Sequence, residues 1–200
     1  TFNLDPKAVE AAIQQLARRV VLGQSAFSIE RLWQEMFRNE FARGGPILNS
    51  AIGSIEMALW DIVGKALDRP VYDLLGGSVR DRIPAYTYIY PETDEGAGPL
   101  WTNPAACAER AKAYVDRGFT AVKFDPIMAS TTVYRNYQQF VPVQESLEGL
   151  ETASAVTKAV REAVGRKADL LIGTHGQLTA AGAIRLAKRL EPYEPLWFEE

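Results

Sequence analysis

Hydrophobic positions recur at helical spacing through the first third of the chain. Val9, Ile13, Leu16 and Val20 are three or four residues apart, and this spacing predicts a helix over residues 5–22 with one buried face. A second helix is expected over 28–41, before a Gly-Gly-Pro break. A third is expected over 49–66, with an apolar stripe made of Ile52, Ile55, Leu59, Ile62 and Ala66.

The pattern changes after residue 82, where short apolar runs begin to alternate with amphipathic segments. Helices are predicted over 103–117, about 150–164 and 179–190. Four strands are predicted at 83–90, 120–125, 168–173 and 196–199. This alternation indicates parallel strands joined by right-handed crossovers, and the nearly continuous apolar character of the strands indicates that both faces are covered.

Two parallel architectures compete for this pattern, an open doubly wound sheet and a closed (β/α)8-type barrel. The first strand-to-helix connection, "YPETDEGAGPLW", lacks the G-x-G-x-x-G fingerprint of a dinucleotide-binding open sheet, which favours the barrel. Only about four βα units fit after the helical third, whereas a barrel needs eight. We therefore expect an α/β fold that holds half a barrel, within a longer protein.

Composition narrows the class of function. The 200 residues carry a net charge of -3 with both signs interleaved, which provides no basic surface for nucleic acid or an anionic membrane. The only cysteine, Cys107, excludes an intrachain disulfide and favours a reducing compartment. Since no apolar run has the ~18 residues of a membrane span, we expect a cytoplasmic protein.

Polar side chains gather where the predicted strands end. Tyr88, Lys123, Asp125, His175 and Glu199 all lie at or next to such ends, and parallel strands deliver these ends to one edge of a sheet. Each residue also has a plainer interpretation: the lysine and the aspartate as a solvated ion pair, the histidine as a turn residue bound to the backbone, and the glutamate as exposed acid. Ionisable residues at the ends of three separate strands, in the same register, are less expected by chance than any one of them alone. Their coincidence therefore favours a functional site over the plainer interpretations.

Other chemistries find no support. The segment "GSIEM" lies inside a helix and lacks the G-x-S-x-G pattern of a nucleophilic serine, and "GTHGQ" lacks the lysine of a phosphate-binding loop.

Three segments, "SAIGSIEMALWDIVGKALDRPVYDLLGG", "GFTAVKFDP" and "LEPYEPLWFEE", together resemble the mandelate racemase and muconate-lactonizing branch of the enolase superfamily, particularly its sugar-acid dehydratases. The resemblance implies the helical part of an α+β capping domain over residues 1–80 and the first half of a barrel over 81–200. It also implies Mg²⁺ held by carboxylates at the ends of the third, fourth and fifth strands, and removal of the proton next to a substrate carboxylate.

The resemblance therefore implies a Mg²⁺-dependent lyase that dehydrates an acid sugar, an aldonate or aldarate, with a general acid assisting departure of the β-hydroxyl. One alternative is a cycloisomerase or epimerase acting on a sugar acid or its lactone. Another is a catalytically silent subunit that binds a sugar acid or serves assembly. A small acid sugar is the expected partner, without nucleic acid or membrane, and we expect a homo-oligomer.

The resemblance also assigns roles by position. His175 matches a third-strand histidine and is expected to transfer a proton, while Lys123 and Asp125 are expected to be catalytic and, with Tyr88, to bind the substrate. The aspartate at position 125 excludes a lysine base there. Glu199 matches the fourth-strand metal ligand.

Gly173 departs from the family's pattern. It stands where the third-strand aspartate ligand is expected, so one of three carboxylates is missing and the Mg²⁺ site is in doubt. Either His175 or another group substitutes, the metal binds weakly, or the protein does different work. If the position lacks only a ligand, Gly173→Asp should tighten Mg²⁺ binding.

Overall fold

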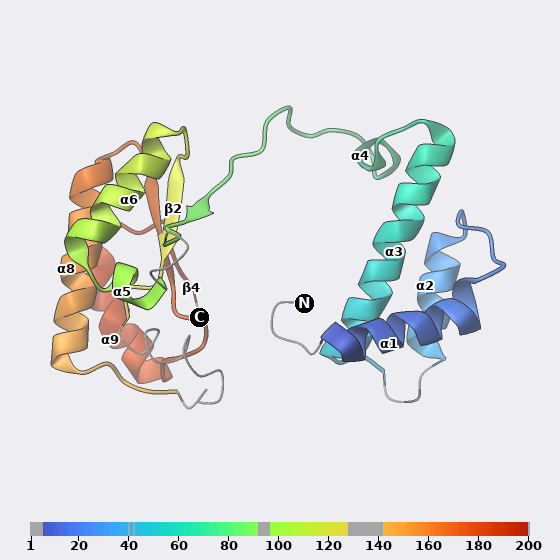
Figure 1. Cartoon of the computed structure of the whole chain (residues 1–200), viewed down its shortest axis with the longest axis horizontal. Helices are drawn as coiled ribbons and strands as arrows, with labels where there is room; N and C mark the ends of the chain where they lie inside the picture. The colour runs from blue at the N-terminus through green and yellow to red at the C-terminus, as the bar shows by residue number, and fades with distance from the viewer. Residues whose placement is uncertain (1–5, 40, 42, 92–96, 128–141, 200) are drawn as a thin grey trace. The chain divides into compact units, whose positions relative to one another are not determined.

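The structure is a computed structural model that describes residues 6–39, 41, 43–91, 97–127 and 142–199. The chain divides into two units, Thr1–Asp81 and Arg82–Glu200, each with its own hydrophobic core (Figure 1). Residue 5, where the first helix was expected to begin, lies outside the described residues.

The described part of the first unit is helical, as its periodicity predicts. Its elements are α1 (Pro6–Leu16), which continues into a π-helical turn η1 (Ala17–Val21), then α2 (Ile29–Arg38), α3 (Pro46–Leu67) and α4 (Val71–Leu74). None of the helices in the described ranges has both the length and the apolar character needed to cross a bilayer.

Helix α3 differs from its prediction in two respects. It begins at Pro46 rather than Asn49, because proline fits the first helical position and Gly45 precedes it with φ +87°. Its buried stripe runs through Ile55 and Leu59 to Val63, whereas Ile62 is 50% exposed. Both positions lie within the arc of the helix that a period of 3.6 residues assigns to the buried face, so the period alone does not decide which of them is buried.

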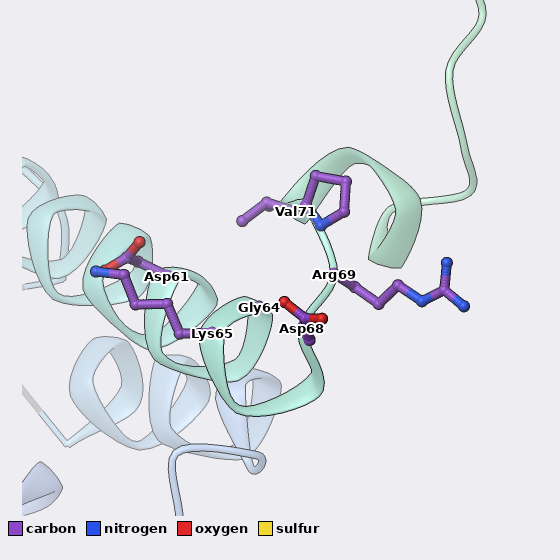
Figure 2. Close-up of a pocket in the computed structure, with 7 residues that line it drawn as sticks. Asp61, Gly64, Lys65, Asp68, Arg69 and Val71 are labelled. Atoms are coloured by element: carbon purple, nitrogen blue, oxygen red, sulfur yellow. The ribbon is translucent and has the colours of Figure 1, made fainter.

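The end of α3 turns sharply into α4 (Figure 2). Asp68 adopts a left-handed conformation with φ 51°, and its backbone N–H bonds to the carbonyls of Gly64 and Lys65. A Cβ at position 64 would lie 2.9 Å from the carbonyl oxygen of Arg69, so glycine allows this return of the chain.

The described residues of the second unit form one parallel sheet of four strands, in the order β1-β2-β3-β4. The strands are β1 (Thr87–Tyr88), β2 (Ala121–Phe124), β3 (Asp169–Gly173) and β4 (Trp197–Glu199). The predicted strand order and α/β class are confirmed. Strand β1 is shorter than the predicted 83–90, since Pro84 has no N–H for a ladder and Ile83 is 85% exposed.

Helices α6, α8 and α9 lie on one side of this sheet (Figure 1). The helical elements are α5 (Ala97–Trp101), α6 (Pro104–Asp116), α8 (Leu147–Val164), α9 (Ala180–Leu190) and the 3-10 turn η2 (Glu191–Tyr193). Asn103, Ser146 and Thr179 cap α6, α8 and α9 by accepting a hydrogen bond from the backbone N–H three residues on.

Successive side chains of β2 and β3 point to opposite faces of the sheet, and the two faces have different surroundings. Val122, Phe124, Leu170 and Ile172 are fully buried and pack in the core beneath the helices. Because side chains alternate across a strand, Lys123 and Leu171 point to the opposite face. The sheet thus has a helix-covered face and a second face on which the polar strand ends lie.

Candidate active site

The register of the sheet brings the polar strand ends together. Lys123 pairs in register with Tyr88 on β1 and Leu171 on β3, and Gly173 pairs with Glu199 on β4. Parallel partners direct their side chains to the same face, so these positions share the face opposite the helices. Asp125 follows β2 at the same parity as Lys123, and it belongs to this face as well.

Lys123 and Glu199 form an ion pair across the sheet. The Nζ atom lies 2.5 Å from Oε2, and the lysine side chain is 5% exposed whereas the glutamate side chain is 36% exposed. The ammonium also lies 5.1 Å from the ring centroid of Tyr88 and 5.9 Å from that of Tyr86, within cation–π range. A buried positive charge therefore sits at the strand ends.

Asp125 and His175 form the second pair. The imidazole Nδ1 lies 2.7 Å from Asp125 Oδ2, and the aspartate side chain is fully buried while the imidazole is partly exposed. The Tyr88 hydroxyl lies 3.4 Å from Asp125 Oδ1 and 3.5 Å from His175 Nε2. An ionised carboxylate accepts hydrogen bonds only, so Nδ1 carries a proton in this pair.

The backbone after β3 aims the imidazole at Asp125. His175 is left-handed with φ 51°, Gly176 follows with φ 66°, and the N–H of Gln177 bonds to the carbonyl of Thr174. The Thr174 hydroxyl donates to the carbonyl of Glu199, which ties the ends of β3 and β4 together. A left-handed histidine is uncommon and is found more often at functional sites.

His175 does not cap the following helix, because Thr179 does so. The plainer interpretation of a turn histidine is therefore incomplete: its ring bonds to a side chain from a different strand, 50 residues earlier.

All five residues predicted for the site, Tyr88, Lys123, Asp125, His175 and Glu199, lie within this group of contacts. The pairing between them was not predicted. Sequence parity placed Lys123 and Asp125 on one side of β2, but each bonds to a partner from another strand end rather than to the other. Asp125 is 0% exposed, a feature that favours contact with His175 over direct contact with a substrate.

Gly173 has a steric role that the sequence did not reveal. A Cβ at this position would lie 2.5 Å from Asp125 Oδ1, 3.1 Å from Lys123 Cε and 3.1 Å from the Tyr88 hydroxyl. The expectation that Gly173→Asp would simply restore a ligand therefore needs correction, because Asp125 occupies the space that the new side chain would enter.

The described residues do not make a magnesium site by themselves. Glu199 is paired with Lys123, Asp125 is paired with His175, and Gly173 offers no ligand. Within the ranges that the structure describes, no three His, Cys, Asp or Glu side chains are grouped to hold a metal ion. Mg²⁺ normally requires near-octahedral oxygen ligands, which this set does not supply.

A surface pocket lies in the first unit, at the end of α3 (Figure 2). Asp61 and Lys65 line it and form an ion pair of 2.6 Å with each other, with both side chains more than half exposed. Its polar groups are those of a solvated helix end, and it contains none of the predicted site residues.

Comparison with known proteins identifies the family. Residues 3–76 match the family described as mandelate racemase / muconate lactonizing enzyme, N-terminal domain, and residues 106–200 match the enolase C-terminal domain-like family. The chain belongs to the mandelate racemase and muconate lactonizing enzyme family of the enolase superfamily. The resemblance seen in the sequence is confirmed.

Individual relatives agree with this assignment. A D-galactonate dehydratase from Xanthomonas oryzae pv. oryzae (strain PXO99A) is 38% identical over 194 residues, covering 97% of this chain and 45% of the relative. The mandelate racemase/muconate lactonizing enzyme from Jannaschia sp. CCS1 is 42% identical with a TM-score of 0.87, covering 99% of this chain and 50% of that one. The enzyme of the same description from Sulfitobacter sp. is 38% identical with a TM-score of 0.85, covering 99% of this chain and 48% of that one.

This chain thus spans about half the length of the relatives it matches.

Proposed function

We propose that the protein to which this chain belongs is an acid-sugar dehydratase, and that His175 donates the proton that converts the departing β-hydroxyl into water. The observation that carries the proposal is the 2.7 Å contact between His175 Nδ1 and the buried Asp125 carboxylate. The name of the 38% identical relative from Xanthomonas, D-galactonate dehydratase, supports the substrate class.

The Asp125–His175 pair suits a general acid. With Nδ1–H donated to Asp125, the second ring nitrogen, Nε2, is the atom that gains and releases the transferred proton. A carboxylate at this distance stabilises the positive charge of the doubly protonated ring before the proton is given up. Asp125 then acts as a positioning residue for the imidazole, while His175 contacts the substrate.

Lys123 suits a different task. Its ammonium is buried at the strand ends, and an acid sugar carries a carboxylate whose negative charge grows towards the enolate when the neighbouring proton is removed. We assign Lys123 to electrostatic binding of that carboxylate, with Tyr88 beside it. The base that removes the α-proton is expected in the part of the relatives that this chain does not cover.

Gly173 and the Lys123–Glu199 pair favour a second candidate, a subunit that binds an acid sugar without converting it. In that case the lysine neutralises Glu199 and Mg²⁺ has no role in this half of the site. Magnesium dependence of the whole protein, with Glu199 as a ligand, stays a prediction.

The test uses the full-length protein and a panel of aldonates and aldarates with and without Mg²⁺. A dehydratase releases water and forms a 2-keto-3-deoxy acid, which can be detected chemically and by mass. An isomerase or epimerase yields a product of unchanged mass. Saturable binding with no product from any member of the panel would support the silent subunit and refute the dehydratase.

A further inference from the structure

We infer that Gly173 is a positioning residue: the lack of a side chain at this position creates the space in which Asp125 holds the His175 imidazole. A Cβ on Gly173 would lie 2.5 Å from Asp125 Oδ1, closer than such contacts occur in proteins. A side chain at 173 and a carboxylate in the observed place at 125 therefore exclude each other.

The need for glycine is steric and does not come from the backbone. Gly173 lies in β3, in register with Glu199, and its φ is not in the left-handed region. By contrast, Gly176 has φ 66° and open space where a Cβ would lie, with no atom within 4 Å, so its requirement is conformational. An alanine at 173 fits the strand, and only its neighbours oppose it.

Asp125 cannot easily give way. Its side chain is fully buried, Oδ2 is bonded to His175 Nδ1, and Oδ1 lies 3.4 Å from the Tyr88 hydroxyl. The other two atoms near a Cβ at position 173, Lys123 Cε and the Tyr88 hydroxyl, would be 3.1 Å away and need to move by only a few tenths of an ångström. The conflict is thus concentrated on the carboxylate that orients the imidazole.

The position of the ring proton depends on this space. When Asp125 is in place, Nδ1 carries the proton of the neutral imidazole and Nε2 is the ionisable nitrogen. When a side chain at 173 displaces the carboxylate, this preference is lost. The link to catalysis rests on the proposed function, whereas the position of the ring proton does not.

A double-mutant cycle in the full-length protein tests the inference, with Gly173→Ala, Asp125→Ala and the double variant. Nitrogen-15 NMR of labelled histidine, with the signal assigned by its loss in His175→Asn, reports which nitrogen is protonated. We expect an Nδ1 proton in the parent and loss of this preference in both single variants. Gly173→Ala should lower kcat by about 10²-fold, as for a displaced catalytic group, but add little in the Asp125→Ala background.

Each outcome decides the question. A Gly173→Ala variant with the parental tautomer overturns the inference, as does an equal loss of activity or folding from Gly173→Ala in both backgrounds. If Gly173→Ala alone fails to fold and the double variant folds, the steric exclusion is supported. If the NMR spectra show that Gly173→Ala and Asp125→Ala both remove the preference for an Nδ1 proton, but no acid sugar is converted, the inference stands and the proposed function fails.

Discussion

At the scale of single residues, the site consists of two ion pairs with different exposure. Lys123 is buried and Glu199 is one-third exposed, whereas Asp125 is buried and His175 is partly exposed. In each pair one partner is buried and the other reaches solvent. A buried partner fixes the geometry of the exposed one, which is the arrangement expected for a preorganised site.

This asymmetry predicts unequal effects of breaking the Lys123–Glu199 pair. Glu199→Gln leaves a buried ammonium without its carboxylate and should lower the free energy of unfolding by about 1–3 kcal/mol. Lys123→Met keeps the apolar stem and leaves a carboxylate that water can reach, so it should cost less than about 1 kcal/mol. Urea denaturation of the two variants checks this, and equal losses or the reverse order would contradict it.

Most of the element boundaries follow from local sequence rules. The strands β2, β3 and β4 and the capped helices α6 and α9 lie where apolar runs and capping residues placed them. Two of the boundaries that were missed lie close to a proline, Pro46 and Pro84. Glycine and proline before α3 indicated a break, yet Pro46 begins the helix, and the aromatic run before Tyr88 pairs over only two residues.

The grouping of the candidate residues at one edge of the sheet was predictable from the sequence, whereas the contacts between them were not. Parity and parallel order place Lys123, Asp125 and Glu199 at one edge, because these properties depend only on strand period and topology. Which side chain meets which depends on side-chain length and on the space beside Gly173, and neither can be derived from a linear pattern. For the same reason, Gly173 looked like a lost ligand when it is also the space for Asp125.

Helix α3 offers a matched pair of glycines for testing the packing at its end. Gly64→Ala would place a Cβ 2.9 Å from the carbonyl oxygen of Arg69, whereas at Gly53 nothing lies within 4 Å of a Cβ. Gly53→Ala should stabilise the protein by up to about 1 kcal/mol through helix propensity. Gly64→Ala should destabilise the protein, because the clash with the Arg69 carbonyl outweighs the gain in helix propensity. Thermal unfolding of both variants decides this, and stabilisation by both would contradict the packing described.

At the scale of the whole molecule, the helix-covered face of the sheet belongs to the hydrophobic core of the second unit, and the opposite face carries the candidate site. The core beneath α6 and α8 contains Cys107, which is 0% exposed, and burial raises the pKa of its thiol from 9.0 to about 12. This thiol is therefore a probe of opening of the second unit.

Two results are expected from Cys107. At pH 8 a thiol reagent should modify it only when the protein unfolds, so its rate should rise with urea alongside the loss of helix signal. Between about pH 9 and 12 the unfolded state loses the thiol proton while the folded state keeps it, so stability should fall as pH rises through this window. The Cys107→Ala variant is the control for both measurements, because it lacks this thiol. Rapid modification of the folded protein at pH 8 would contradict the buried position.

The central claim is that the ends of these parallel strands deliver His175 as the proton donor in conversion of an acid sugar. The most direct measurement is kcat of His175→Asn in the full-length protein, on the acid sugar that the parent converts. Tyr90→Phe is the control, because Tyr90 lies two residues beyond the end of β1 and is 55% exposed. Loss of a general acid should lower kcat by about 10²–10⁴-fold while substrate binding persists, and the control should keep the parental rate. A His175→Asn enzyme whose kcat stays within a few-fold of the parent would contradict the account.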